Sequence, residues 1–184
     1  MFRSPMFRSI LTWGAVAGLV VGGILFGTTV GLAGSPPPPA VGMAIGYASM
    51  LVALSAVFVA IKRHRDTVLG GVIRFWPAFG MGLGISVIAG VFYVLAWEAA
   101  LAVTGADYIG EYTARLLAEK RAAGASAAEL ARLGAEMAAF ARQYANPLYR
   151  MPITFTEIFP VGVLVSLVSA ALLRNPRFLP ARAG

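Results

Sequence analysis

The chain has 184 residues, of which 59% are hydrophobic and 12% charged, and its mean hydropathy is +0.78. Soluble domains are about 45–50% apolar and about 25% charged, so this composition excludes an ordinary soluble domain and indicates a membrane protein. The chain contains no cysteine, which excludes disulfides, thiolate zinc sites and cysteine nucleophiles, and its net charge of +7 raises the question of nucleic-acid binding.

Four apolar segments are long enough to cross a membrane, because a spanning helix needs about 20 apolar residues. The first runs from about residue 10 to 33 and the second from about 40 to 61, and neither contains a charge. The third, about 76–103, contains Glu98, and the fourth, about 153–173, contains Glu157. The sequence therefore predicts an all-α fold, a four-helix transmembrane bundle in a single membrane domain over residues 1–184.

The first segment has a second interpretation as the apolar core of a cleaved signal peptide. Arg3 and Arg8 precede it, and the small residues of GLAGS, 31–35, follow it. Signal-peptide cores are about 7–15 residues long, and this segment is longer. We therefore expect it to be retained as a span.

Glycines recur at every fourth position of the first span, in two series. The series are Gly14, Gly18 and Gly22, and then Gly23, Gly27 and Gly31. Such a series lets another helix backbone approach closely. The simpler interpretation is that both series assemble the bundle. The alternative is that one of them remains for a second copy or another membrane protein, and the pattern alone does not choose.

Two short loops join neighbouring spans. SPPPP, residues 35–39, predicts a short external hairpin, because prolines cannot continue a helix. KRHRDTVLGG, residues 62–71, contains the only histidine, His64. Its His-Arg-Asp tripeptide is found in kinase catalytic loops, but the other kinase motifs are missing. We interpret this loop as a basic anchor at the inner membrane surface, turned by Gly70 and Gly71.

Residues 104–150 form the only sizeable segment outside the predicted spans, and they favour two helices. Ser126 followed by Glu129 is a capping box that begins the second helix. Its apolar stripe comprises Leu130, Leu133, Met137, Phe140 and Tyr144. The earlier helix, about 107–122, has a shorter stripe of Ile109, Tyr112 and Leu116. We expect an external antiparallel hairpin that caps the outer mouth of the bundle, with a partner-binding hairpin as the alternative.

Basic residues gather at the ends of the spans on one side of this topology. There are nine: Arg3, Arg8, Lys62, Arg63, Arg65, Arg74, Arg174, Arg177 and Arg182. One acid, Asp66, accompanies them, whereas residues 104–150 hold six basic and five acidic residues. This positive-inside pattern predicts a multi-pass membrane protein with both termini in the cytoplasm. Because the charges flank spans and form no stripe with interleaved aromatics, we expect the lipid bilayer as partner and no nucleic acid.

Polar residues cluster near the outer ends of the third and fourth spans. The candidate cluster is Glu98, Tyr144, Asn146, Arg150, Thr154, Glu157 and Pro160. We expect both carboxylates at similar depth, with Arg150 able to pair with either. Pro160 deprives the Thr156 carbonyl of its helical donor, and we expect the Thr154 and Thr156 hydroxyls to help satisfy such freed groups. The carboxylates are either structural partners or a ligand or proton site.

Motifs of the common enzyme classes are absent: there is no pair of histidines, no His-Glu-x-x-His, no Gly-x-Ser-x-Gly and no phosphate loop. We therefore expect no enzymatic activity, no cofactor and no metal site.

Two stretches carry a resemblance to a known family. Residues 61–98 contain a basic loop followed by Asp and Gly-Gly, and residues 144–173 contain EIFPVG. Together they resemble the bacterial membrane proteins grouped as domain of unknown function 4199, over nearly the whole chain. The resemblance implies a four-helix integral protein of the bacterial inner membrane and implies no activity. An aromatic residue commonly stands at the position of His64 in that pattern, which argues against a catalytic histidine.

The absence of catalytic motifs and the presence of packing faces favour one function class. We predict a non-enzymatic accessory or assembly component of the bacterial cell envelope membrane, in a homo-oligomer or with other membrane proteins. The alternative is a small proton- or ion-coupled transporter or channel that uses Glu98 and Glu157.

Overall fold

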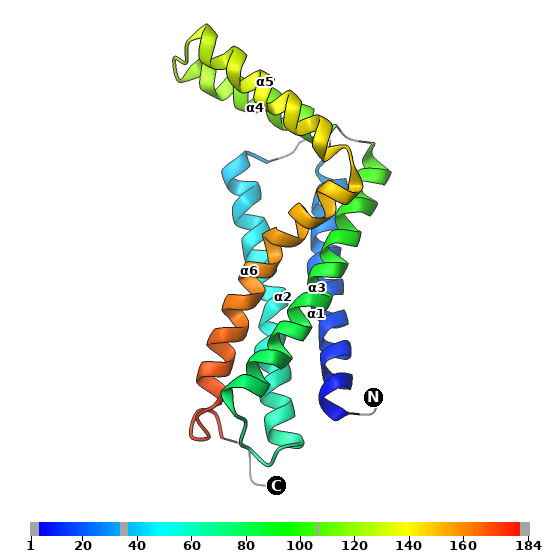
Figure 1. The fold of residues 1–184 in the computed structure, drawn as a ribbon, viewed down its shortest axis with the longest axis vertical. Coiled ribbons are helices and arrows are strands. Elements are labelled where there is room, and N and C mark those ends of the chain that lie inside the picture. The colour runs from blue at the N-terminus through cyan, green and yellow to red at the C-terminus, as the bar shows by residue number, and fades with distance from the viewer. Residues whose placement is uncertain (1–3, 34–36, 106, 181–184) are drawn as a thin grey trace.

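The computed structural model describes residues 4–33, 37–105 and 107–180. These residues form helices and no strand: α1 (Pro5–Gly31), α2 (Pro39–Thr67), α3 (Phe75–Thr104), α4 (Tyr108–Ala122), α5 (Ala127–Tyr144) and α6 (Pro147–Leu173). Figure 1 shows four long helices side by side, with α4 and α5 at one end of them. The predicted all-α fold is confirmed.

Helices α1, α2, α3 and α6 are each long and apolar enough to cross a membrane, with 27 to 30 residues. The chain is therefore a multi-pass membrane protein. Figure 1 shows the start of α1 and the end of α6 at the end opposite α4 and α5. We call this the basic end, because it carries Arg8, Lys62, Arg63, Arg65, Arg74, Arg174 and Arg177. We call the other end the hairpin end; Arg3, Arg182 and residues 34–36 of the proline loop lie outside the described residues.

The spans are longer than the apolar pattern predicts, and α1 begins at Pro5 and not near residue 10. Helix α6 begins at Pro147 and not near residue 153, because the Asn146 side chain accepts a hydrogen bond from the Leu148 N–H at 3.0 Å and a proline at the first position needs no donor. Helix α2 continues to Thr67 and not to 61. Long basic side chains at the end of a helix can extend to the aqueous surface of the membrane. Helix α2 can therefore continue beyond its last apolar residue.

Helix α1 packs parallel to α3 through its first glycine series. The facing pairs are Gly14 with Ile88, Gly18 with Phe92 and Gly22 with Ala96. A Cβ atom added to any of these glycines would lie only 2.6–3.1 Å from the facing side chain. The absence of side chains on this face is therefore what lets the two helices approach so closely.

Helix α6 packs antiparallel on another face of α3 through serines set against glycines. Ser86 lies over Gly162, and Ser166 lies over Gly82, where added Cβ atoms would be within 2.8 Å of the serine Cβ atoms. The two serine hydroxyls are 3.4 Å apart, and each also bonds a carbonyl of its own helix. This seam buries polar groups with their hydrogen bonds satisfied, which an apolar surrounding requires.

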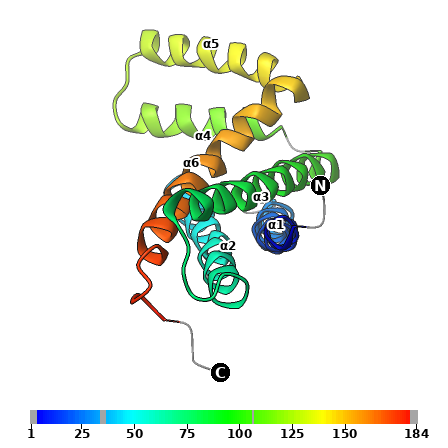
Figure 2. The same ribbon diagram turned by 60° about the horizontal axis from the view of Figure 1, so that its bottom comes forward.

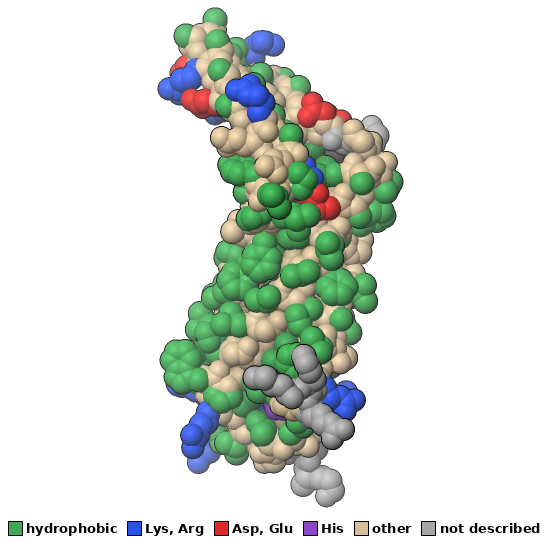
Figure 3. All heavy atoms as spheres, turned by 45° about the vertical axis from the view of Figure 1, so that its right-hand side comes forward, with side chains coloured by type: hydrophobic (Ala, Val, Ile, Leu, Met, Phe, Trp, Pro, Cys, Tyr) green, Lys and Arg blue, Asp and Glu red, His purple; other side chains and the backbone are tan. Residues whose placement is uncertain are grey.

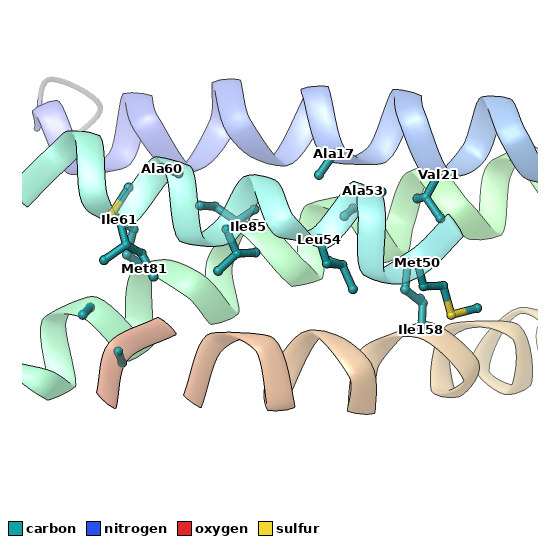
Figure 4. Close-up of a cluster of buried hydrophobic side chains, with 14 of the residues drawn as sticks. Ala17, Val21, Met50, Ala53, Leu54, Ala60, Ile61, Met81, Ile85 and Ile158 are labelled. Carbon is teal, nitrogen blue, oxygen red and sulfur yellow. The ribbon is translucent and has the colours of Figure 1, made fainter. Parts of the chain in front are cut away.

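An apolar core fills the space between the four long helices. Figure 4 shows side chains of all four helices meeting there, among them Val21, Leu54, Met81, Ile85 and Ile158. Helix α2 closes the bundle by packing on α1 and α6, and only lightly on α3. The bundle thus leaves α3 between α1 and α6, which determines the residues that meet at the hairpin end.

Helices α4 and α5 lie side by side, joined by a turn that includes Gly124 at φ +87° (Figure 2). The predicted capping box is present: the Glu129 N–H donates to the Ser126 hydroxyl, and the Ser126 N–H donates to the Glu129 carboxylate at 2.8 Å. These hydrogen bonds hold the pKa of Glu129 below its usual value. Tyr112 is 42% exposed and does not belong to a buried stripe. Figure 1 shows the turn as the tip farthest from the bundle, and capping of the mouth stays a prediction.

Candidate functional site

Three helices bring part of the predicted polar cluster together at the hairpin end. The Arg150 guanidinium on α6 pairs with both carboxylate oxygens of Glu98 on α3, with 2.7 Å between Nε and Oε1. A third N–H of Arg150 donates to the Tyr144 carbonyl at the end of α5, at 3.1 Å. The side chains of Arg150 and Glu98 are 14% and 19% exposed. Of the two carboxylates predicted as partners for Arg150, Glu98 is therefore the one it binds.

Aromatic side chains surround this ion pair. The Tyr144 hydroxyl accepts a hydrogen bond from the Trp97 indole N–H at 2.9 Å, and Arg150 lies over the Tyr144 ring at 5.6 Å. Tyr108 of α4 meets Trp97 edge to face. Burial raises the pKa of the Tyr144 hydroxyl and of the Tyr108 hydroxyl. The cluster connects α3, α5 and α6 through polar contacts and α4 through an aromatic contact, as a structural joint would.

Glu157 lies outside the ion pair, although its charge adds to burial in raising the pKa of the Tyr108 and Tyr144 hydroxyls. Its carboxylate accepts a hydrogen bond from the Tyr93 hydroxyl at 3.3 Å, and within the described residues it forms no ion pair. Glu157 lies seven residues after Arg150, about 10 Å farther along α6 from the hairpin end. The prediction of similar depth for the two carboxylates is therefore wrong, because α6 begins at Pro147 and sets Arg150, and not Glu157, opposite Glu98. Tyr93, which is 5% exposed, was not singled out from the sequence.

The remaining members of the predicted cluster shape α6. Asn146 begins the helix, and the buried Thr154 hydroxyl donates to the Arg150 carbonyl at 3.1 Å. The Thr156 hydroxyl donates to the Ile153 carbonyl. Neither hydroxyl thus reaches the Thr156 carbonyl that Pro160 deprives of its donor, contrary to expectation. A second internal proline, Pro152, was overlooked, because its position lay before the predicted start of the span.

A cavity of about 180 Å³ lies beside the ion pair. Its lining comprises Leu101, Asp107, Tyr108, Ile109, Ala141, Tyr144, Ala145 and Arg150, and Glu157 is not among them. This volume is below the roughly 300–1,000 Å³ of typical ligand sites. In the described part of the chain, no group of three or more His, Asp or Glu side chains is placed to hold a metal ion.

The second glycine series of α1 is open. An added Cβ atom at Gly23, Gly27 or Gly31 would meet nothing within 4 Å, and all three residues are exposed. Gly23 follows Gly14 by nine residues, which turns it about 180° around the helix from the face that packs on α3. The two series therefore lie on opposite faces of α1.

Arg65 at the basic end is a buried residue that the sequence did not distinguish from its neighbours. It is 0% exposed, and its guanidinium donates to the carbonyls of Leu173, Phe178 and Leu179 and to the Asp66 carboxylate. It therefore holds the end of α6 and the segment that follows against α2. His64 beside it is also buried, and its Nδ1 has no hydrogen-bond partner within the described residues.

Comparison with known protein families identifies a match over most of the chain. The family described as "Protein of unknown function (DUF4199)" matches residues 12–175. No curated protein and no solved structure matches the chain.

Proposed function

The chain belongs to the DUF4199 family, and on that premise, together with its four candidate spans, we propose that it is a non-enzymatic accessory or assembly component of a bacterial cell envelope membrane. A non-enzymatic role is favoured because the sequence contains no His-Glu-x-x-His, Gly-x-Ser-x-Gly or phosphate-loop motif. Assembly is favoured by one observation, the open glycine face of α1.

The open face is formed by Gly23, Gly27 and Gly31, with Val16 and Val20 continuing it toward the basic end. Between helices in lipid, association depends on close packing and not on apolar area, so glycine series favour helix contacts. The opposite face of α1 already packs in this way, because its glycines lie against Ile88, Phe92 and Ala96 of α3.

We propose a second copy of the chain as the occupant of this face. Two copies inserted in the same orientation bring their α1 helices parallel, and a two-fold axis along the membrane normal pairs each glycine face with itself. The contact of α1 with α3 is also parallel and uses the same four-residue spacing. No charged residue lies within the face, so nothing in it opposes burial against an identical helix.

Gly27→Leu is expected to abolish self-association while leaving the fold intact. Its side chain enters open space in the monomer but separates two α1 helices in the dimer. The mass of the protein in mild detergent, measured by light scattering, should fall from dimer to monomer. Gly46→Leu on α2, also in open space, is the matched control and should stay dimeric. A monomeric unsubstituted protein, or a Gly27→Leu variant as dimeric as the control, would contradict the proposal.

We further propose that the basic end faces the cytoplasm. Seven basic side chains at that end, against the single acid Asp66, support this orientation. A reporter that is active only outside the cytoplasm should give signal when inserted near Gly124 and none when fused after Gly184. The reverse pattern would show that the orientation is inverted.

A second candidate function rests on Glu157, which lies within a span and has no cationic partner among the described residues. Such a group is costly in a membrane and is a candidate proton or ion site. For an assembly component, we expect Glu157→Gln to reach normal yield and to keep full activity in complementing a gene deletion, because the amide still accepts from Tyr93. A proton carrier instead loses all activity in this variant, since an amide does not titrate. Proton flux into vesicles that depends on Glu157 would establish the transporter.

A further inference from the structure

A surface cavity lies at the basic end, between the start of α1 and the end of α2. Its volume is about 480 Å³, within the roughly 300–1,000 Å³ of typical ligand sites. The lining comprises Pro5, Arg8, Ser9, Thr12 and Trp13 of α1 and Arg63 of α2. Two guanidinium groups, two hydroxyls and an indole ring therefore meet around one open space.

Among the described residues, the polar side chains of this pocket have no hydrogen-bond or ion-pair partners. Neither Arg8 nor Arg63 forms an ion pair in the described part of the chain, and no side-chain hydrogen bond is found there for either residue. The Ser9 and Thr12 hydroxyls likewise form no hydrogen bond within the described residues. Other helical hydroxyls behave differently: Thr28, Ser49, Ser55 and Thr67 each bond a carbonyl of their own helix. The pocket thus presents donors that remain available to a ligand.

The charge around the pocket favours an anion. The only acid near this end, Asp66, is occupied by Lys62 at 2.6 Å and by Arg65 at 2.7 Å. Helix α1 has no acidic residue in its first turn, and the Ser4 side chain does not cap it, so the positive end of its dipole adds to the field of the two arginines. Guanidinium groups bind phosphate oxygens well, in paired hydrogen bonds.

Apolar surface continues directly from the pocket along α1. Leu11, Val16 and Leu19 are 46%, 43% and 64% exposed, and Trp13 lines the pocket itself. Figure 3 shows Lys and Arg side chains at the basic end and a mostly hydrophobic surface above them. A ligand that fills the pocket and follows this surface combines an anionic head with apolar chains.

We propose that this pocket binds the phosphate of an anionic phospholipid, with Arg8 and Arg63 as the phosphate-binding residues and the acyl chains along α1. The site lies on the opposite end of the molecule from the Glu98–Arg150 joint. The phosphate-binding residues Arg8 and Arg63 are outside the open glycine face, whereas the acyl-chain surface shares Val16 with it. Binding of the phosphate therefore does not depend on the assembly proposal.

The test uses the full chain in mild detergent with dioleoylphosphatidylglycerol as the probe, and lipid binding is followed by native mass spectrometry. The unsubstituted protein should bind this lipid in preference to dioleoylphosphatidylcholine. Each arginine near an anionic headgroup contributes roughly a fivefold change in affinity, so Arg8→Gln with Arg63→Gln should weaken binding by about 25-fold. Arg74→Gln, a change at an exposed arginine of the same end that does not line the pocket, is the matched control and should bind as the unsubstituted protein does.

Three results would overturn the proposal: equal binding of both lipids, equal loss of binding in the control, or full competition by millimolar inorganic phosphate, which would identify a free-anion site. The double variant should unfold at the same temperature as the unsubstituted protein without lipid, because both side chains are exposed and unpaired. If the double variant is not recovered, the two single variants test the proposal. Each should bind dioleoylphosphatidylglycerol roughly fivefold more weakly than the unsubstituted protein does.

Discussion

Arg65→Met is expected to destabilise the folded protein by about 3–5 kcal/mol, the range found when one partner of a buried ion pair is removed. The Arg65 guanidinium is 0% exposed and donates to Asp66 and to the carbonyls of Leu173, Phe178 and Leu179. Methionine fills much of the volume but donates no hydrogen bond, so these acceptors lose their partner in a place of restricted hydration. The segment after α6 should then detach from α2.

Thermal unfolding in mild detergent and limited proteolysis of residues 174–180 measure this effect. Arg177→Met, a change at an exposed arginine of the same segment, should leave both unchanged. The unfolding temperature of Arg65→Lys should lie between those of the two methionine variants. An ammonium group cannot donate to all the acceptors that the planar guanidinium group binds. An unfolding temperature for Arg65→Met equal to that of Arg177→Met would contradict the assigned role.

Arg150→Met is expected to destabilise the folded protein by more than the roughly 1 kcal/mol of an exposed ion pair. The loss should be smaller than the about 3–5 kcal/mol found when a fully buried ion pair is broken. The ion pair with Glu98 is bidentate and only partly exposed, and Arg150 also donates to the Tyr144 carbonyl. Its loss removes the main polar link between α3 and the start of α6. Hydrogen exchange of residues 144–150 should therefore rise more than exchange at the basic end.

The reversed pair, Glu98→Arg with Arg150→Glu, tests whether pairing is the cause. It should recover part of the stability that either single charge reversal loses, because the opposite charges meet again. Arg142→Met, a change at an exposed arginine of α5, is the control and should have little effect. Losses that simply add in the double variant would exclude the ion pair as the origin.

The elements of the fold were largely predictable, because each has a local cause. Four apolar segments longer than a bilayer predicted the four long helices, and Ser126 with Glu129 predicted the start of α5. The early start of α6 also had a local signal, Asn146 followed by Pro147, which an apolar window does not detect.

The partners of the charged side chains were not predictable, because they depend on how helices align. Glu98 meets Arg150, and Glu157 meets Tyr93, only because α3 and α6 are antiparallel at one particular register. Likewise, Arg63 and Arg65 are two arginines of the same basic segment, yet Arg63 is exposed and Arg65 is fully buried. The two glycine series of α1 have the same spacing, and only the position of α3 distinguishes the packed one from the open one.

Cysteine cross-linking in native membranes tests the proposed assembly most directly, because the chain has no cysteine of its own. Disulfides form only when two Cα atoms come within about 7 Å, so a covalent dimer reports that the same position of two copies meets. We expect Gly27→Cys to give a covalent dimer on oxidation and Gly46→Cys, at an open position of α2, to give none. No dimer from Gly27→Cys, or equal dimer from both variants, would contradict assembly through the open glycine face of α1.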